Sequence, residues 1–179
     1  MKIALLATDG FEESELTEPK KALEAAGAEV DVLSDHPGEI QGYRHHEPGQ
    51  RVKVDHTWDE IHIEEYSGLV LPGGSRNAAK AREFPRVRQI IWEMERARKP
   101  IAAICHGPWE LISAEVVTGR KMTSAPKIQD DVRRAGGQWE DAEVVVDQNL
   151  VTSRGPEDLP AFNREMIALL EKEPVAQER

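Results

Sequence analysis

The chain of 179 residues has one cysteine, Cys105, no long apolar run and no excess of positive charge. A single cysteine excludes an internal disulfide, so we expect a cytoplasmic protein in a reducing environment. No apolar stretch approaches the roughly 20 residues that span a bilayer, and Met1–Thr8 resemble a strand without a basic leader, so we expect no membrane partner. A formal net charge of −10 argues against nucleic acid, whose phosphates require a basic surface.

Strand and helix signals alternate along the chain, without internal repeats or low-complexity tracts. Apolar strand-like runs occur at 2–8, 29–33, 68–71, 101–104, 143–146 and 150–153, the last two as a hairpin. Helical spacing begins near 13, 87, 107, 128 and 162. Repeated βα units predict a mostly parallel sheet with helices on both faces. We expect one domain over 1–173 and a flexible tail over 174–179.

Cys105 lies where the apolar run Ile101–Ile104 meets a helical run that begins at Gly107. This pattern predicts a nucleophile elbow, a sharp strand-to-helix turn that exposes a side chain above the sheet. Positive charge at the helix N-terminus favours a thiolate, so we expect the thiol pKa to fall below about 8.5. An inert buried cysteine is the alternative, but His106 and Gly107 suit a polar turn better than a core.

Two other loops follow strands and should meet the elbow at the same edge of the sheet. Gly73 and Gly74 leave a bare backbone whose N–H groups, with that of His106, could hold an oxyanion; a plain tight turn is the equal alternative. Glu12, Glu13 and Glu15 begin the first helix, where acidic side chains are favourable in any case. A glutamate that reached the sulfur would keep its proton and donate it to the thiolate.

The six histidines limit the possible chemistry, because none lies beyond His106. Papain-like proteases and class I glutamine amidotransferases need a histidine well after the cysteine, so both are disfavoured. The other histidines, at 36, 45, 46, 56 and 62, fit no standard zinc pattern. We therefore expect no metal and no cofactor.

Four motifs, at 9–16, 69–74, 103–108 and 145–154, together resemble the DJ-1/PfpI family, and the resemblance covers almost the whole chain. The most similar branch contains bacterial general-stress proteins and PfpI-type intracellular proteases, and the run 159–165 resembles the last helix of the stress proteins. The resemblance implies a flavodoxin-like three-layer α/β sandwich with a nucleophile elbow. It also implies a homodimer or a larger homo-oligomer.

The resemblance also implies roles for individual residues. Cys105 would be the nucleophile, Glu15 its acidic partner with Glu12 as a second acid nearby, and the backbones of Gly74 and His106 the oxyanion hole. The expected function is a stress-related hydrolase or lyase, glyoxalase III-like or deglycase-like, with small carbonyl compounds such as methylglyoxal or its adducts as substrate. A PfpI-type cysteine peptidase is the runner-up. A non-enzymatic redox sensor or chaperone with an oxidisable cysteine is the third interpretation.

Three positions depart from the protease pattern. Ala78 stands where PfpI-type proteases carry an acid that a neighbouring subunit uses, so we expect little peptidase activity. Ala125 replaces a tyrosine beside the cysteine. The stretch Tyr43–Gln50 is longer than in those relatives and brings His45 and His46, which could reshape the rim of the pocket.

Overall fold

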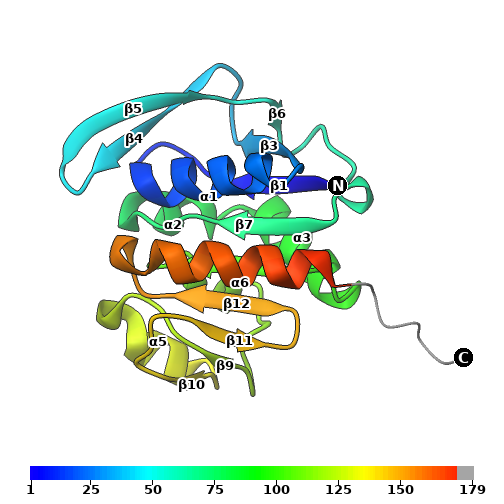
Figure 1. Cartoon of the computed structure of the whole chain (residues 1–179). Helices are drawn as coiled ribbons and strands as arrows, with labels where there is room; N and C mark the ends of the chain where they lie inside the picture. The colour runs from blue at the N-terminus through cyan, green and yellow to red at the C-terminus, as the bar shows by residue number, and fades with distance from the viewer. Residues whose placement is uncertain (173–179) are drawn as a thin grey trace, which may run out of the picture.

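The computed structural model describes residues 1–172 and places a seven-stranded sheet between two layers of helices (Figure 1). Its strand order is β11-β12-β8-β7-β1-β3-β6, and every pair is parallel except the hairpin β11-β12. The strands are β1 (Lys2–Leu6), β3 (Glu29–Ser34), β6 (His56–Thr57), β7 (Gly68–Leu71), β8 (Ile101–Ile104), β11 (Val145–Asp147) and β12 (Leu150–Ser153). The central order β3-β1-β7-β8-β12 is that of a flavodoxin-like sheet, which confirms the predicted fold class.

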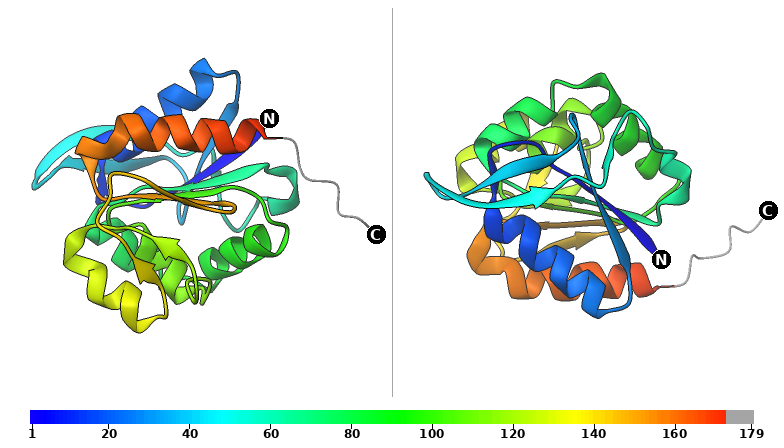
Figure 2. Two further views of the ribbon diagram at one scale, coloured as in Figure 1. Left: turned by 60° about the horizontal axis from the view of Figure 1, so that its bottom comes forward. Right: turned by 90° about the horizontal axis from the view of Figure 1, so that it is seen from above.

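Helices cover both faces of this sheet (Figure 2). One face carries α1 (Glu13–Ala25) and α6 (Leu159–Glu171). The opposite face carries α2 (Ser75–Ala81), α3 (Pro85–Arg96), α4 (Pro108–Ser113) and α5 (Gln129–Arg134). Short 3-10 helices lie in connecting segments: η1 (Ile63–Glu65), η2 (Pro126–Ile128) and η3 (Pro156–Asp158).

The central strands β1, β7 and β8 are almost wholly apolar because each buries side chains on both faces. In β1, Ile3 and Leu5 pack in the cluster beneath α1 and α6, whereas Ala4 and Leu6 pack in the cluster beneath α3. Ile90 is one of four buried residues that repeat at helical spacing along α3 and fill that second cluster. The predicted hairpin at 143–153 and the last helix are both confirmed.

A second sheet stands apart from the first and was not predicted. It consists of β2 (Phe11–Glu12), β4 (Glu39–Arg44) and β5 (Glu47–Lys53), and the β4-β5 hairpin extends beyond the main sheet in Figure 1. Gly42 lets the hairpin lie on Phe11, because a Cβ at position 42 would approach that ring to 2.7 Å. The side chains of β5 are mostly exposed, so the sequence shows no apolar alternation there.

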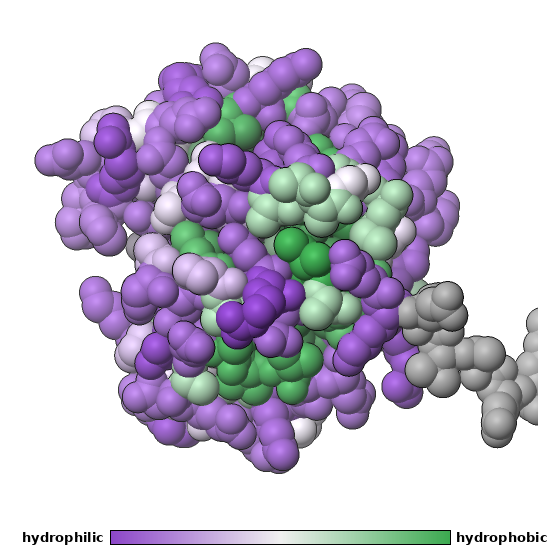
Figure 3. Space-filling view, in the orientation of Figure 1, coloured by the Kyte–Doolittle hydropathy of each residue, from purple (hydrophilic) through white to green (hydrophobic). Residues whose placement is uncertain are grey.

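A short parallel pair, β9 (Lys121–Met122) and β10 (Gln138–Trp139), lies beside α5. The face seen in Figure 3 is mostly hydrophilic, with separate apolar clusters around α6. No helix within residues 1–172 is both long and apolar enough to cross a membrane. The tail predicted at 174–179, and the last residue of the predicted domain, lie outside the described residues.

Candidate active site

The nucleophile elbow forms as the sequence predicts. Cys105 connects β8 to α4 with a φ of +62°, a left-handed conformation that a non-glycine residue adopts only under strain. Two backbone hydrogen bonds hold it there: its N–H donates to the Ser153 carbonyl at 3.0 Å, and the Ala125 N–H donates to its carbonyl at 2.8 Å. Gly107 is required because a Cβ would approach the Leu71 carbonyl oxygen to 2.5 Å.

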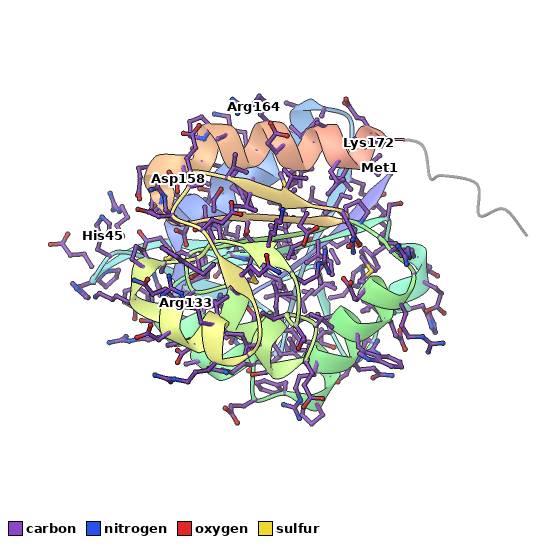
Figure 4. The ribbon with its side chains drawn as sticks, turned by 90° about the horizontal axis from the view of Figure 1, so that it is seen from below. Met1, His45, Arg133, Asp158, Arg164 and Lys172 are labelled. Carbon is purple, nitrogen blue, oxygen red and sulfur yellow. The ribbon has the colours of Figure 1, made fainter. Side chains whose placement is uncertain are left out.

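A cavity of about 270 Å³ opens above Cys105, at the carboxyl ends of the parallel strands. Glu12, Glu15, Gly74 and His106 line it together with Cys105, so the structure brings all the predicted site residues into one cavity. Figure 4 shows His45 and Asp158 near this end of the molecule and Met1 and Lys172 at the other end. Such a crevice is where open α/β sheets bind their ligands.

Glu15 faces Cys105 across the bare backbone of Gly73. A Cβ at position 73 would approach Glu15 Oε1 to 2.2 Å and Cys105 Cβ to 2.7 Å, so only glycine fits between them. Neither carboxyl oxygen makes a well-formed hydrogen bond, although the Gly73 N–H and the Cys105 thiol partly stabilise the charged form. Complete burial, followed by the charge of Glu12, raises the pKa of Glu15 to about 8. Glu15 therefore carries a proton at neutral pH.

The predicted fall in the thiol pKa is wrong. Burial raises the pKa of the Cys105 thiol, and the charge of Glu15 raises it further, whereas the N–H groups of His106 and Gly74 lower it. The prediction considered the helix end and His106, but α4 has only six residues and desolvation outweighs it. Since two anions in one buried site destabilise each other, both Cys105 and Glu15 hold their protons at neutral pH.

Gly74 lies at the contact between two loops of the site. Its φ is +92°, and a Cβ would approach the Gly10 carbonyl oxygen to 2.4 Å, so the loops after β1 and β7 touch through bare backbone. The backbone N–H groups of Gly74 and His106 both lower the pKa of the Cys105 thiol, so both lie close to its sulfur. Donors in this position could also hold an oxyanion that develops beside the sulfur.

Asn77 is a positioning residue that sequence reasoning missed. It is fully buried, and its side-chain N–H groups donate to the carbonyls of Pro72 and Gly73 at 3.1 Å each. Its Oδ1 accepts the Thr8 N–H at 2.8 Å. One amide therefore joins the loop after β7 to the end of β1. A polar residue three positions after the double glycine was the available signal.

His106 is the histidine next to Cys105. Its Nδ1 lies 3.3 Å from Cys105 Sγ, and its ring packs edge-to-face on Trp109 with centroids 5.0 Å apart. Burial, with the nearby charge of Lys127, lowers the pKa of His106, so the imidazole is neutral at neutral pH. No carboxylate in the described chain hydrogen-bonds to this ring. Ala78, the position expected to hold an acid in the proteases, is fully buried in α2.

The β4-β5 hairpin contributes to the rim of the cavity. The His45 N–H donates to both carboxyl oxygens of Glu12 at 3.2 Å, and the guanidinium of Arg76 stacks on the Tyr43 ring at 5.3 Å. His46 also lines the cavity. Within residues 1–172, no three His, Cys, Asp or Glu side chains gather as metal ligands.

Comparisons with known proteins agree with this geometry. The sequence model of the DJ-1/PfpI family matches residues 1–169. The chain is 47% identical over 174 residues to Deglycase TK1284 of Thermococcus kodakarensis, covering 95% of this chain and 99% of that protein. It is 42% identical over 173 residues to General stress protein 18 of Bacillus subtilis, covering 96% and 98%.

A solved structure shows the same fold. It is a two-domain protein of Anabaena variabilis with DJ-1/ThiJ/PfpI-like and ferritin-like domains, and it superposes with a TM-score of 0.90 at 30% identity. The match covers 99% of this chain and 52% of that longer one, so this chain spans about half of the two-domain protein. By its sequence from end to end, its sheet order and the elbow at Cys105, the chain belongs to the DJ-1/PfpI family.

Proposed function

We propose that this protein is a cysteine-dependent enzyme that converts small reactive carbonyl compounds, such as methylglyoxal or its adducts on amines, into hydroxy acids. One observation carries the proposal: the Cys105 thiol, a protonated carboxyl and two backbone N–H groups meet in a single cavity. Such a site suits addition to an aldehyde and stabilisation of the oxyanion that results. The name deglycase, given to the relative from T. kodakarensis, supports the same class of substrate.

The first step is addition of sulfur to the aldehyde. The neutral imidazole of His106, 3.3 Å from the sulfur, accepts the thiol proton. The sulfur then forms a bond to the aldehyde carbon, and the π electrons of the carbonyl move onto its oxygen. The N–H groups of Gly74 and His106 hold the negative charge until Glu15 donates a proton, which gives a hemithioacetal. An adduct on an amine gives the same intermediate when the thiol displaces that amine.

The second step is an internal redox exchange that needs no external oxidant. The Glu15 carboxylate that remains removes the proton from the former aldehyde carbon, and the imidazolium of His106 gives its proton to the ketone oxygen, which forms an enediol. Glu15 then gives its proton to the second carbon, and the hydroxyl on the first carbon returns a proton to His106. The first carbon is thereby oxidised to a thioester while the second is reduced to an alcohol. Water then attacks the thioester, the carbon–sulfur bond breaks, and the products are lactate and the free thiol of Cys105.

Peptide cleavage makes a greater demand on the site. It requires a proton for the leaving amine, and an imidazole supplies one well when a third group orients it. Among residues 1–172 only the sulfur hydrogen-bonds to the imidazole ring of His106. Addition to an aldehyde has no leaving group, so the cavity supports carbonyl chemistry better than proteolysis.

The test is turnover of the purified protein on methylglyoxal, followed by lactate, with Cys105→Ala as the control. We expect lactate from the wild type and none above background from the variant. A preformed adduct, with free methylglyoxal removed by a trapping amine, separates direct deglycation from capture of released methylglyoxal. Direct deglycation requires amine release faster than spontaneous dissociation. Cys105-dependent cleavage of an unfolded peptide, without lactate formation, would overturn the proposal.

A further inference from the structure

Two cations, Arg76 and Lys127, line the cavity above Cys105. The chain has 33 acidic and 23 basic side chains, so carboxylates are plentiful. Even so, neither cation makes an ion pair or a side-chain hydrogen bond with any residue in 1–172. Both side chains are exposed at the rim of the cavity, so their charges remain available to a molecule that enters it.

Arg76 lies on one side of the cavity, and its guanidinium packs on an aromatic ring. It is the second residue of α2. Its Cβ packs against Gly10, because a Cβ added at position 10 would approach the Arg76 Cβ to 2.6 Å. Its guanidinium stacks on the Tyr43 ring at 5.3 Å. Stacking uses the flat face of the group and leaves its N–H edge available for an acceptor.

Lys127 lies on another side, in η2. The preceding residues are anchored to the nucleophile, because the Ala125 N–H donates to the Cys105 carbonyl at 2.8 Å. Its charge is also felt by the neighbouring imidazole of His106. The two cations therefore approach the reactive sulfur from different elements, α2 and η2.

The acids of the cavity do not cancel these charges. Glu15 is protonated at neutral pH, and the carboxylate of Glu12 is engaged by the His45 N–H through two contacts of 3.2 Å. The charge of Glu157, in η3, also raises the pKa of Glu15, but Glu157 does not line the cavity. One carboxylate thus faces two cations in a molecule whose net charge is −10.

We propose that Arg76 and Lys127 form an anion subsite that selects small carbonyl substrates bearing a carboxylate or a phosphate group. An arginine fork and a lysine point charge are the usual receptors for such groups. The cavity of about 270 Å³ suits one small molecule, and the negative charge of the whole protein repels polyanions. The inference rests on the proposed function for turnover, whereas binding of the anionic group does not depend on it.

The test uses two alkylating reagents that differ in charge. Iodoacetate and iodoacetamide react in the same way: sulfur forms a bond to carbon and iodide leaves. The ratio of their rates at Cys105, divided by the ratio for 2-mercaptoethanol, measures the preference of the cavity for an anion. We expect a preference of about tenfold at low salt that falls as salt is added.

Matched variants assign the preference to the two cations. Arg76→Gln and Lys127→Gln should each reduce the ratio several-fold, and dividing by the iodoacetamide rate of the same variant removes any change in the reactivity of the thiol itself. Arg164→Gln, which removes the same charge from the outer surface of α6 (Figure 4), should leave the ratio unchanged. A ratio at or below that of the free thiol, or one that both cavity variants preserve, would overturn the inference.

Competition identifies the anionic group. Inorganic phosphate and acetate, each at about 0.1 M with ionic strength held constant by NaCl, should slow alkylation if they occupy the subsite. Stronger protection by phosphate indicates phosphorylated substrates, stronger protection by acetate indicates carboxylates, and protection by neither overturns the subsite. Alkylation needs no turnover, so an inactive enzyme with a high ratio contradicts the proposed function and leaves the anion subsite intact.

Discussion

Glu15 should make the folded protein less stable as the pH rises. Its pKa is raised from 4.5 to about 8, so between these values the folded state holds a proton that the unfolded state releases. The free energy of unfolding then falls with pH from 4.5 and reaches its full loss above about pH 8. A difference of roughly 3.5 pKa units, at about 1.36 kcal/mol each, corresponds to about 5 kcal/mol.

Glu15→Leu and Glu15→Gln remove this titration. Each variant should gain stability relative to the wild type as the pH rises from 5 to 8, by several kcal/mol, while losing turnover. Urea unfolding followed by tryptophan fluorescence at pH 5, 6, 7 and 8 measures the difference. Repeating the series in Cys105→Ala isolates the part that burial causes, because the coupled thiol is then absent.

The matched control is Glu18→Gln, which removes an exposed carboxyl from the same helix. An exposed side chain loses little hydration on folding, so this variant should follow the wild type across the series. The reasoning would be refuted if Glu15→Leu and Glu15→Gln also followed the wild type from pH 5 to 8. Burial of the Glu15 carboxyl would then have no thermodynamic cost.

Three further predictions use other measurements. Glutamine can donate a hydrogen bond to the sulfur of Cys105 and leucine cannot, so the pH midpoint for alkylation should be lower in Glu15→Gln than in Glu15→Leu. Turnover in the leucine variant should fall by roughly 10², and equal midpoints would contradict the role of Glu15 as a proton donor. Glu110 is fully buried in α4 with both carboxyl oxygens unpaired, and burial raises its pKa well above 4.5. Glu110→Leu should therefore stabilise the protein above pH 5 by about 1–4 kcal/mol in urea unfolding, and a destabilised variant would contradict this. Asn77→Ala should cost about 2–4 kcal/mol and lower turnover at 25 °C, because it leaves the Thr8 N–H and the Pro72 carbonyl unpaired; unchanged stability would mean that water replaces the amide.

Local patterns in the sequence determined much of the architecture. The buried strands are continuous apolar runs, and the apolar face of α3 repeats at helical spacing, so the alternating elements were predictable. The order Cys105, His106, Gly107 after an apolar strand predicted the elbow, because only a sharp turn accommodates those residue types there. The order of four motifs along the chain indicated the family.

The family resemblance indicated Glu15 as the acid beside the sulfur, but the physical reason for that choice is found only in the tertiary structure. Glu13 and Glu15 begin the same helix, yet the Glu13 carboxyl accepts the Gln50 N–H at 2.6 Å from the hairpin, whereas Glu15 is completely buried beside Cys105. The depth of that burial also reversed the predicted direction of the thiol pKa. Desolvation depends on everything packed around a group, so residues close in sequence cannot reveal it.

The hairpin and the two cations of the cavity were likewise hidden from sequence reasoning. The exposed side chains of β5 show no strand pattern, and its pairing partners lie in other segments. Arg76 and Lys127 are 51 residues apart in the chain and meet at one cavity because β7 and β8 are neighbours in the sheet. Sequence determined the elements and the reactive residue, whereas packing between distant segments decided charge, burial and the shape of the site.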